Sequence, residues 1–448
     1  MTSRDAAFSS PGSSKPLPPP LFRWIVLVVI SLAMFGNYYV YDAISPIADL
    51  LRDQLGFSDS QIGTLNAIYS FPNIIMVLVG GIIIDRIGVK KATLLFGALC
   101  FIGAGITAAT GEFVVMAAGR LVFGLGAESL IVSVTVGIAR WFRGRELSFA
   151  FGVNLTIARL GSFLALNSPT WARPAYENWQ WPLFITVGFA TFCVVGALVY
   201  WVLENGAERK YDLGEAGLGE AGETDRVEWG DLFAFPRSYI WVVLLCVTFY
   251  SAIFPFQTFA IKFFQDAHGA SRETAGFLSS IITLFSMIFT PLFGLWVDRV
   301  GKRSLFMMFG SLLLVPVYLV MAYTEVNLMV PMATMGIAFS LVPAVMWPSV
   351  AYLVEEAKLG TAYGLMTMIQ NIGLFGFNWM IGWANDYSGA SATNPGGYAL
   401  GMWIFSVLGF LGFFFAFMLR REEMGPHSHG LETITVQSTK QAEAAGRS

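Results

Sequence analysis

The sequence predicts an all-α protein that crosses a membrane many times, and three observations lead to this fold class. The chain has 448 residues, of which 55% are hydrophobic and only 13% are charged. A soluble protein of this length needs a more polar surface. Apolar stretches long enough to span a bilayer recur along the chain, and the second half repeats features of the first.

Twelve stretches are apolar and long enough to span the membrane as helices. They form two groups of six, which predicts domains at residues 22–203 and 238–420, joined by a polar linker at residues 204–237. We expect the polar residues 1–21 and 421–448 to be disordered tails. The expected spans are residues 22–51, 60–84, 92–110, 113–139, 147–168, 180–203, 238–265, 272–298, 303–323, 327–354, 361–385 and 397–420.

Basic residues predict the orientation of these spans. The loops that follow even-numbered spans carry most of the Lys and Arg residues, whereas the opposite side carries few: Arg52, Arg173, Lys262 and Arg272. Because cytoplasmic loops carry the excess of positive charge, we expect both termini to be cytoplasmic. The expected location is the cell (inner) membrane, with the lipid bilayer as surroundings.

One motif occurs at the same point of both halves. Asp85-Arg86-x-Gly88 ends the second span, and Asp298-Arg299-x-Gly301 ends the eighth. A parallel repeat of six spans with such a motif is typical of the major facilitator architecture. At the cytoplasmic ends of spans, these carboxylates are expected to pair with basic side chains and helix ends, and so to control conformational change.

From residue 22 to about residue 420 the chain resembles the major facilitator superfamily. The repeated motif resembles that superfamily's hairpin loop motif, and Gly119-Arg120-x-x-x-Gly124-x-Gly126 resembles its fourth-span motif, which implies a structural or gating role for Arg120. Further blocks are similar to its lysosomal dipeptide transporter branch, which implies movement of dipeptides by facilitated diffusion. These blocks are Tyr38-Tyr39-x-Tyr41-Asp42, Tyr69-Ser70-x-Pro72-Asn73, Gly126-Ala127-Glu128-Ser129-Leu130, Trp141-Phe142-x-Gly144-x-Glu146-Leu147, Ala158-Arg159-x-Gly161-Ser162, Ala252-Ile253-Phe254-Pro255-Phe256, Leu359-Gly360-Thr361-Ala362-Tyr363-Gly364 and Ile369-Gln370-Asn371.

Two charged residues lie near the middle of consecutive spans, Glu128 in the fourth and Arg159 in the fifth. A charge at mid-depth costs about 2.5–3.5 kcal/mol on insertion scales, so it needs a partner, a wet cavity or a function. A zwitterionic peptide would place its ammonium at Glu128 and its carboxylate at Arg159. The alternative is a Glu–Arg bridge that joins the two spans.

Neutral and acidic residues extend this candidate site. Asp42, beside Tyr38 and Tyr41 near the outer end of the first span, is expected either to contact the substrate's ammonium group or to form an outer gate or interfacial belt. In the second half, Trp347, Gln370 and Asn371 are expected either to line the cavity or to pack between helices.

Other classes of function are disfavoured by the sequence. There is no Walker-type phosphate loop and no buried histidine relay, so we expect neither an enzyme nor a cofactor or metal site. A net charge of −3 gives no reason to expect a nucleic-acid partner. The predicted function is therefore alternating-access uniport of dipeptides by a monomer. The alternatives are a proton- or anion-coupled transporter of organic anions or drugs, and a non-transporting membrane sensor.

Overall fold

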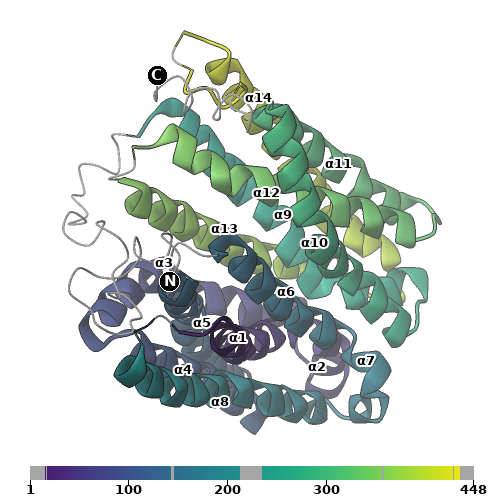
Figure 1. Ribbon diagram of the computed structural model, residues 1–448. Helices are drawn as coiled ribbons and strands as arrows, with labels where there is room; N and C mark the ends of the chain where they lie inside the picture. Colours follow the sequence, from purple (N-terminus) through teal and green to yellow (C-terminus); the bar gives the residue numbers. More distant parts are fainter. Residues whose placement is uncertain are drawn as a thin grey trace. The chain divides into compact units, whose positions relative to one another are not determined.

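The computed structural model describes Pro16 and residues 18–142, 146–211, 235–355, 358–426 and 428–433, which are almost wholly helical (Figure 1). The predicted linker lies outside these residues between 212 and 234, as do most of the first 17 residues and residues 434–448. The long helices are α1 (Pro20–Asp42), α3 (Asp59–Ile87), α4 (Val89–Ala109), α5 (Phe113–Phe142), α6 (Leu147–Leu166), α8 (Gln180–Lys210), α9 (Arg237–His268), α10 (Arg272–Val300), α11 (Arg303–Tyr323), α12 (Met329–Leu353), α13 (Leu359–Tyr387) and α14 (Ala399–Glu423). The short helices are α2 (Ala48–Leu55), α7 (Ser168–Trp171), η2 (Ser45–Ile47), η3 (Arg173–Glu177) and η7 (Pro395–Tyr398).

The predicted all-α, multi-span fold class is confirmed, and each expected span overlaps one of the long helices, although the expected span 22–51 also runs through η2 and into α2. In the described part of the chain, ten helices are long and apolar enough to cross a membrane, or eleven if α3, bent by 60°, counts as one span. The remaining helix, α13, carries four amide side chains that lower its hydropathy: Gln370, Asn371, Asn378 and Asn385.

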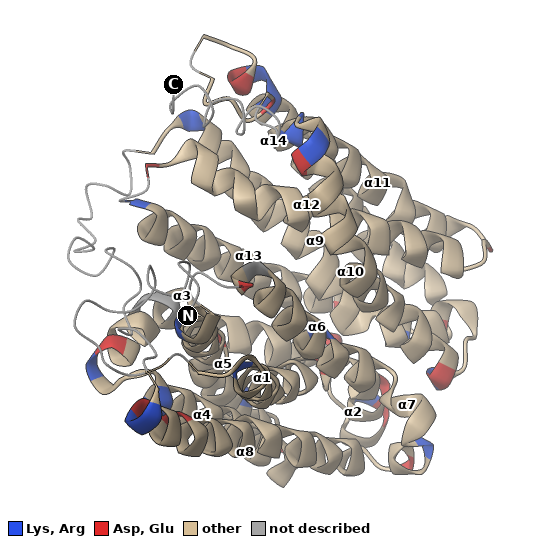
Figure 2. Cartoon of the chain, viewed as in Figure 1, with Lys and Arg blue, Asp and Glu red and all other residues tan. Residues whose placement is uncertain are grey.

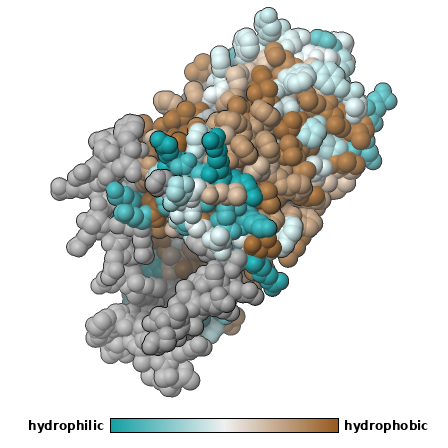
Figure 3. Space-filling view, turned by 90° about the horizontal axis from the view of Figure 1, so that it is seen from above, coloured by the Kyte–Doolittle hydropathy of each residue, from teal (hydrophilic) through white to brown (hydrophobic). Residues whose placement is uncertain are grey.

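Charged and apolar residues are separated along the helices. Figure 2 shows that most Lys, Arg, Asp and Glu residues of the described chain lie at or near helix ends. Hydrophobic residues cover much of the described surface in Figure 3, and many large apolar side chains are exposed, such as Val114 at 76% and Val202 at 71%. Exposed apolar side chains on long helices are what a lipid environment requires.

The chain divides into two compact units that do not coincide with the two groups of six spans. Unit 1 comprises residues 1–43, 71–165 and 174–223, and unit 2 comprises residues 44–70, 166–173 and 224–448. Within unit 1, α4 packs against α5 and α8, and α1 packs against α8. Within unit 2, α11 packs against α12 and α14, and α9 packs against α13 and α14. Short segments of the first half thus pack with the second half.

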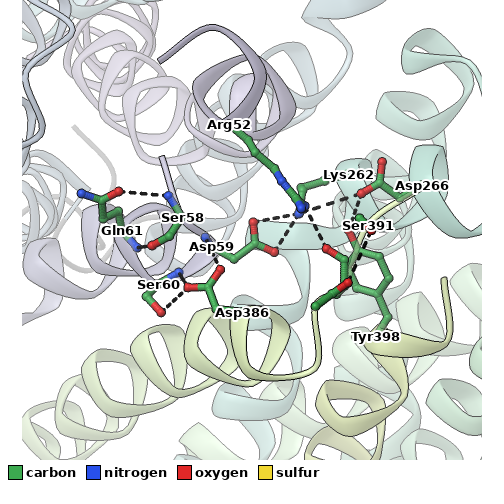
Figure 4. Close-up of polar contacts among 12 residues, drawn as sticks. Arg52, Ser58, Asp59, Ser60, Gln61, Lys262, Asp266, Asp386, Ser391 and Tyr398 are labelled. Carbon is green, nitrogen blue, oxygen red and sulfur yellow. Dashed lines mark hydrogen bonds and ion pairs between the residues drawn. The ribbon is translucent and has the colours of Figure 1, made fainter. Parts of the chain in front are cut away.

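A buried ion pair holds residues 44–70 in unit 2. The Lys262 ammonium on α9 lies 2.7 Å from both carboxylate oxygens of Asp59 at the start of α3 (Figure 4). The two side chains are only 1% and 2% exposed. A second ion pair, between Asp49 and Arg272, joins α2 to α10. Both lie at the end that the basic loops predict to be extracytoplasmic.

The first turn of α3 is completed by a carboxylate from α13. Ser58 and Gln61 form a reciprocal capping box. The Ser58 backbone N–H donates to the Gln61 side-chain oxygen, with nitrogen and oxygen 3.0 Å apart. The Gln61 backbone N–H donates to the Ser58 hydroxyl, with nitrogen and oxygen 3.2 Å apart. The next two backbone N–H groups, of Asp59 and Ser60, donate to the Asp386 carboxylate at 2.8 and 2.7 Å (Figure 4). Gly382 permits this approach, because a Cβ there would lie 2.2 Å from the Asp59 carbonyl oxygen.

Two segments expected to be linker or tail are ordered. Residues 204–210 continue α8, where the fully buried Glu204 pairs with Arg140 and accepts from the Trp141 indole N–H at 3.3 Å. Helix α14 continues to Glu423, and residues 428–433 fold back toward it. The buried Glu423 carboxylate accepts from the backbone N–H of His429 at 2.9 Å. Glu432 accepts from the Ser304 N–H at the start of α11, also at 2.9 Å. The α8 extension carries a buried carboxylate that needs its partners Arg140 and Trp141, and the C-terminal segment supplies an acceptor to a helix-start N–H group of α11 that has no partner within the helix.

We predict that Asp59 and Lys262 stabilise the fold as a coupled pair. Removing one partner leaves the other charge buried and unpaired, so Lys262→Met and Asp59→Asn should each lower the free energy of unfolding by ~3–5 kcal/mol. The double variant removes both charges and should recover part of this loss. Denaturant or thermal unfolding of the purified protein in detergent measures all three.

The matched control is the Arg173–Glu273 pair in the same unit, whose Arg173 side chain is 80% exposed. Glu273→Gln should cost less than about 1 kcal/mol, because water already solvates that pair. Strictly additive losses in the double variant would contradict the coupling of Asp59 to Lys262.

Candidate functional site

The predicted charged site of the first half lies within unit 1, where α6 crosses α1 at close range. Gly161 on α6 allows the approach, because a Cβ at this position would lie 2.2 Å from the Phe35 carbonyl oxygen on α1. Any larger residue would therefore separate the helices. The crossing brings Arg159 and Ser162, which flank Gly161, close to Tyr38 and Asp42 of α1.

Arg159 lies over Tyr38 at this crossing. The guanidinium carbon is 5.5 Å from the centre of the Tyr38 ring, within the range of a cation–π contact. The Tyr38 side chain is also in electrostatic range of Glu128 on α5 and of Asp42. The structure therefore brings together four candidate residues from three separate predicted spans: Tyr38, Asp42, Glu128 and Arg159.

Asp42, the last residue of α1, faces the same group. Its carboxylate accepts a hydrogen bond from the Ser162 side chain and lies in electrostatic range of Arg159 and Arg120. Tyr41 is in electrostatic range of Asp42, Arg120 and Glu128. Two acids, rather than Glu128 alone, thus lie near the arginine that was expected to bind a carboxylate.

Arg120 has a different environment from Asp42, Glu128 and Arg159. It is 1% exposed and donates to the Val40 carbonyl oxygen at 3.0 Å and to that of Tyr41 at 3.3 Å. These are carbonyls of the last turn of α1, which have no partner within the helix. A cation at a helix C-terminus is also favoured by the helix dipole. The contacts are those of a residue that holds the end of α1.

The proposed substrate-binding side chains of unit 1 are more exposed to solvent than Arg120 is. Tyr38, Tyr41, Asp42, Glu128 and Arg159 are each half-buried. Such side chains keep polar surface that a ligand can reach, whereas the Arg120 guanidinium is enclosed. The assembly can therefore present carboxylates and a guanidinium to one small zwitterion.

The candidates of the second half lie in unit 2 and have polar partners there. The Trp347 indole N–H on α12 donates to the Tyr250 hydroxyl at 2.9 Å. On α13, Gln370 lies 3.7 Å from the Cys246 sulfur, and the Asn371 amide donates to the Thr367 carbonyl oxygen at 3.0 Å. The Asn371 side-chain oxygen is buried without a hydrogen-bond partner.

The repeated aspartate–arginine motif differs between the halves. Asp298 pairs with Arg303 at 3.0 Å, and Arg303 also lies over the Tyr352 ring at 4.6 Å. Arg299 is exposed, as are Asp85 and Arg86 at the end of α3. The expected carboxylate–basic contact is thus present at Asp298, whereas Asp85 faces outward.

The sequence did not predict that Asp59 and Lys262 form an ion pair. Lys262 lies inside an expected span, yet it served only to assign orientation. An ionisable residue within a span is by default a candidate for function, so the signal was available. Its partner was not evident, because Asp59 precedes a span of the other half. Among the described residues, no group of three or more His, Cys, Asp or Glu side chains is arranged to hold a metal ion.

Comparisons with known proteins agree with this architecture. The family model described as Major Facilitator Superfamily matches residues 30–265 and 256–442. The lysosomal dipeptide transporter MFSD1 of Mus musculus is 32% identical over 365 residues, which cover 79% of this chain and 78% of the relative. The probable sulfoacetate transporter SauU of Cupriavidus necator is 23% identical, with coverage of 77% and 83%.

Solved structures share the fold at low sequence identity. A bacterial homologue of the human lysosomal transporter Spinster, in an inward-facing and unoccupied conformation, has a TM-score of 0.77 at 15% identity and covers 90% of this chain and 98% of its own. A D-xylose–proton symporter has a TM-score of 0.70 at 18% identity, with the same coverage. From the family match over most of the sequence and from the relative at 32% identity, the chain belongs to the Major Facilitator Superfamily.

Proposed function

We propose that this protein transports dipeptides and similar short peptides across a membrane by alternating access, as a uniporter. The observation that carries the proposal is the group of half-buried charges in unit 1. Arg159 lies over Tyr38, and both Glu128 and Asp42 are in electrostatic range of the same ring. Every dipeptide has one ammonium and one carboxylate, and this group offers a counter-charge for each.

The roles of the charged residues follow from their geometry. A guanidinium presents a planar fork of N–H donors that matches a carboxylate, so Arg159 binds the peptide's C-terminus. Glu128 binds the ammonium, and Asp42 adds a second negative charge. The Tyr38 ring supports both ends, because it contacts the guanidinium and its face attracts cations. Arg120 holds α1 in place and does not contact the substrate.

The names of the relatives support the substrate class. Proteins about 32% identical over most of the chain are named as lysosomal dipeptide transporters, and the block of sequence around each proposed binding charge is part of the resemblance to that branch. A more distant relative is named as a probable sulfoacetate transporter. Small organic anions, which need only Arg159, are therefore the competing substrate class.

The surroundings of the protein follow from its basic residues. We place it as a monomer in the cell membrane with both termini cytoplasmic, because the loops after even-numbered spans carry the excess of Lys and Arg. In this orientation the Asp59–Lys262 pair and the Asp386 cap lie at the extracytoplasmic end of unit 2, and the Asp298–Arg303 contact lies at its cytoplasmic end.

We predict that neutralising either proposed clamp charge abolishes dipeptide uptake. Glu128→Gln and Arg159→Ala each remove a charge-assisted contact worth about 1.5–3 kcal/mol, so uptake should fall by at least about tenfold. Initial rates in proteoliposomes reconstituted with purified protein measure the effect. Acetylating the peptide's N-terminus should mimic the loss of Glu128, and amidating its C-terminus should mimic the loss of Arg159.

The control for this experiment is an exposed charge outside the clamp. Arg86→Gln, at the solvent-exposed end of α3, removes one positive charge, as Arg159→Ala does, but leaves the clamp intact, so dipeptide binding measured by thermal shift should persist. Near-normal uptake in Glu128→Gln or Arg159→Ala would refute the clamp. Inhibition by organic acids but not by unlabelled dipeptides would favour the anion class instead.

We also predict that transport reaches equilibrium without concentrating the peptide. Glu128 and Arg159, which carry opposite charges, both lie in electrostatic range of Tyr38, and His268 is at the extracytoplasmic end of α9 rather than in a buried relay. An imposed pH gradient should therefore leave the final internal dipeptide concentration equal to the external one. Accumulation that a protonophore abolishes would contradict uniport and favour proton symport.

A further inference from the structure

The last described residues of the chain fold back onto unit 2, and we call residues 428–433 the C-terminal segment. Helix α14 ends at Glu423, which is only 3% exposed. Its carboxylate accepts from the backbone N–H of His429 at 2.9 Å and from that of Leu431 at 3.3 Å. The Ser238 hydroxyl at the start of α9 donates to the same carboxylate. The Leu431 side chain is completely buried. The C-terminal segment therefore fills a site beside the ends of α14 and α9.

Glu432 of this segment binds the start of α11. Its backbone carbonyl oxygen accepts from the Lys302 N–H at 2.9 Å, and its carboxylate accepts from the Ser304 N–H at 2.9 Å. Arg420 on α14 lies 3.5 Å from the same carboxylate. The first N–H groups of a helix have no partner within it, and a negative charge is favoured beside them. Glu432 thus caps α11, for which Lys302, the residue before the helix, provides no side-chain cap.

The loop that Glu432 holds has a strained backbone at Lys302. This residue lies in the left-handed region, with φ +49° and ψ +42°, and Glu146 is the only other described non-glycine residue with a positive φ. Such strain persists only where the surrounding structure holds it, and it is concentrated at functional and switch regions. The loop also carries the repeated motif, in which Asp298 pairs with Arg303 at 3.0 Å. The C-terminal segment therefore stabilises the loop that joins these two residues.

The corresponding loop of unit 1 is held in a different way. Gly88 alone separates α3 from α4, and it takes a φ of +82° without the strain of a side chain. Lys90, in the first turn of α4, lies 2.6 Å from Glu208 in the extension of α8. Glu208 is part of a continuous helix, whereas Glu432 lies on a short non-helical segment beyond the end of α14. Only in unit 2 does the carboxylate lie on a segment that can leave without unwinding a helix.

We propose that the C-terminal segment is a conformational latch, which holds the α10–α11 loop while it is docked and must release during each transport cycle. This inference rests on the proposed function, because it assigns the latch to transport. The aspartate–arginine motif is expected to control conformational change, and its loop cannot rearrange while Glu432 binds both Lys302 and Ser304. Buried Leu431 and the Glu423 carboxylate would lose their contacts in the same event, so release has two discrete states.

A reversible cross-link tests whether release is required. The Lys302 N–H donates to the carbonyl that precedes Thr433, so residues 302 and 433 lie beside each other, and both side chains are exposed. The double variant Lys302→Cys and Thr433→Cys leaves Glu432 intact, and the three native cysteines are buried. In proteoliposomes with purified full-length protein, mild oxidation should abolish dipeptide uptake and dithiothreitol should restore it.

The matched controls are the two single-cysteine variants, in which the same oxidation should leave uptake unchanged. Uptake that continues in the double variant, with the cross-link verified by mass spectrometry, would overturn the latch while leaving dipeptide transport intact. Absence of dipeptide uptake by the wild-type protein would instead overturn the proposed function, and the latch would then be judged by a measurement that needs no substrate.

Hydrogen exchange of the purified protein is that measurement. If the segment releases as a unit, the four backbone N–H groups engaged at the latch should exchange together and faster than those in the interior of α11. Glu432→Ala removes a charge-assisted hydrogen bond and should speed exchange at Ser304 by at least about tenfold. The control Thr433→Ala changes the exposed neighbouring side chain and should not. Equal exchange at Ser304 in both variants, or latch exchange as slow as that of the α11 interior, would refute the proposal.

Discussion

The cost of burying charge away from water controls where the ionisable residues of this protein lie. Lys262 and Asp59 are almost completely buried, and each is compensated by the other at 2.7 Å. In unit 1, Glu204 and Arg140 meet the same constraint. An isolated charge at such depth would be too costly to retain. Pairing therefore decides which helix ends must stay together, and the start of α3 joins unit 2 through the Asp59–Lys262 contact.

Helix termini extend the same constraint to uncharged backbone groups. The first N–H groups of α3 are taken by its own capping box and by Asp386, and the last carbonyls of α1 are taken by Arg120. In each case a charged side chain from a distant helix satisfies atoms that have no partner within their own helix. Such contacts fix the ends of α1 and α3, and the end of α1 carries Asp42.

The charged group of unit 1 differs in chemistry from the polar residues of unit 2. Glu128 and Arg159 are half-buried charges in unit 1, whereas Ser340 and Asn371 of unit 2 are neutral and buried. In unit 2 the Trp347 indole N–H is already hydrogen-bonded to the Tyr250 hydroxyl. The charges that we propose to bind the two ends of a peptide therefore lie in unit 1.

The sequence by itself determined the fold class, because twelve apolar stretches separated by polar turns permit little except a helical membrane bundle. It also identified Glu128 and Arg159, since a charge within a long apolar run is conspicuous without any structure. Only the tertiary structure decided which charges meet. Asp59 and Lys262 are about 200 residues apart, and Arg120 became a helix-capping residue through carbonyls that no motif reveals. The hydrogen bond between Trp347 and Tyr250 was equally hidden, because aromatic residues are common in apolar spans and only packing shows which of them meet. Hydropathy is a local property that sequence displays directly, whereas the pairing of side chains depends on how the helices cross.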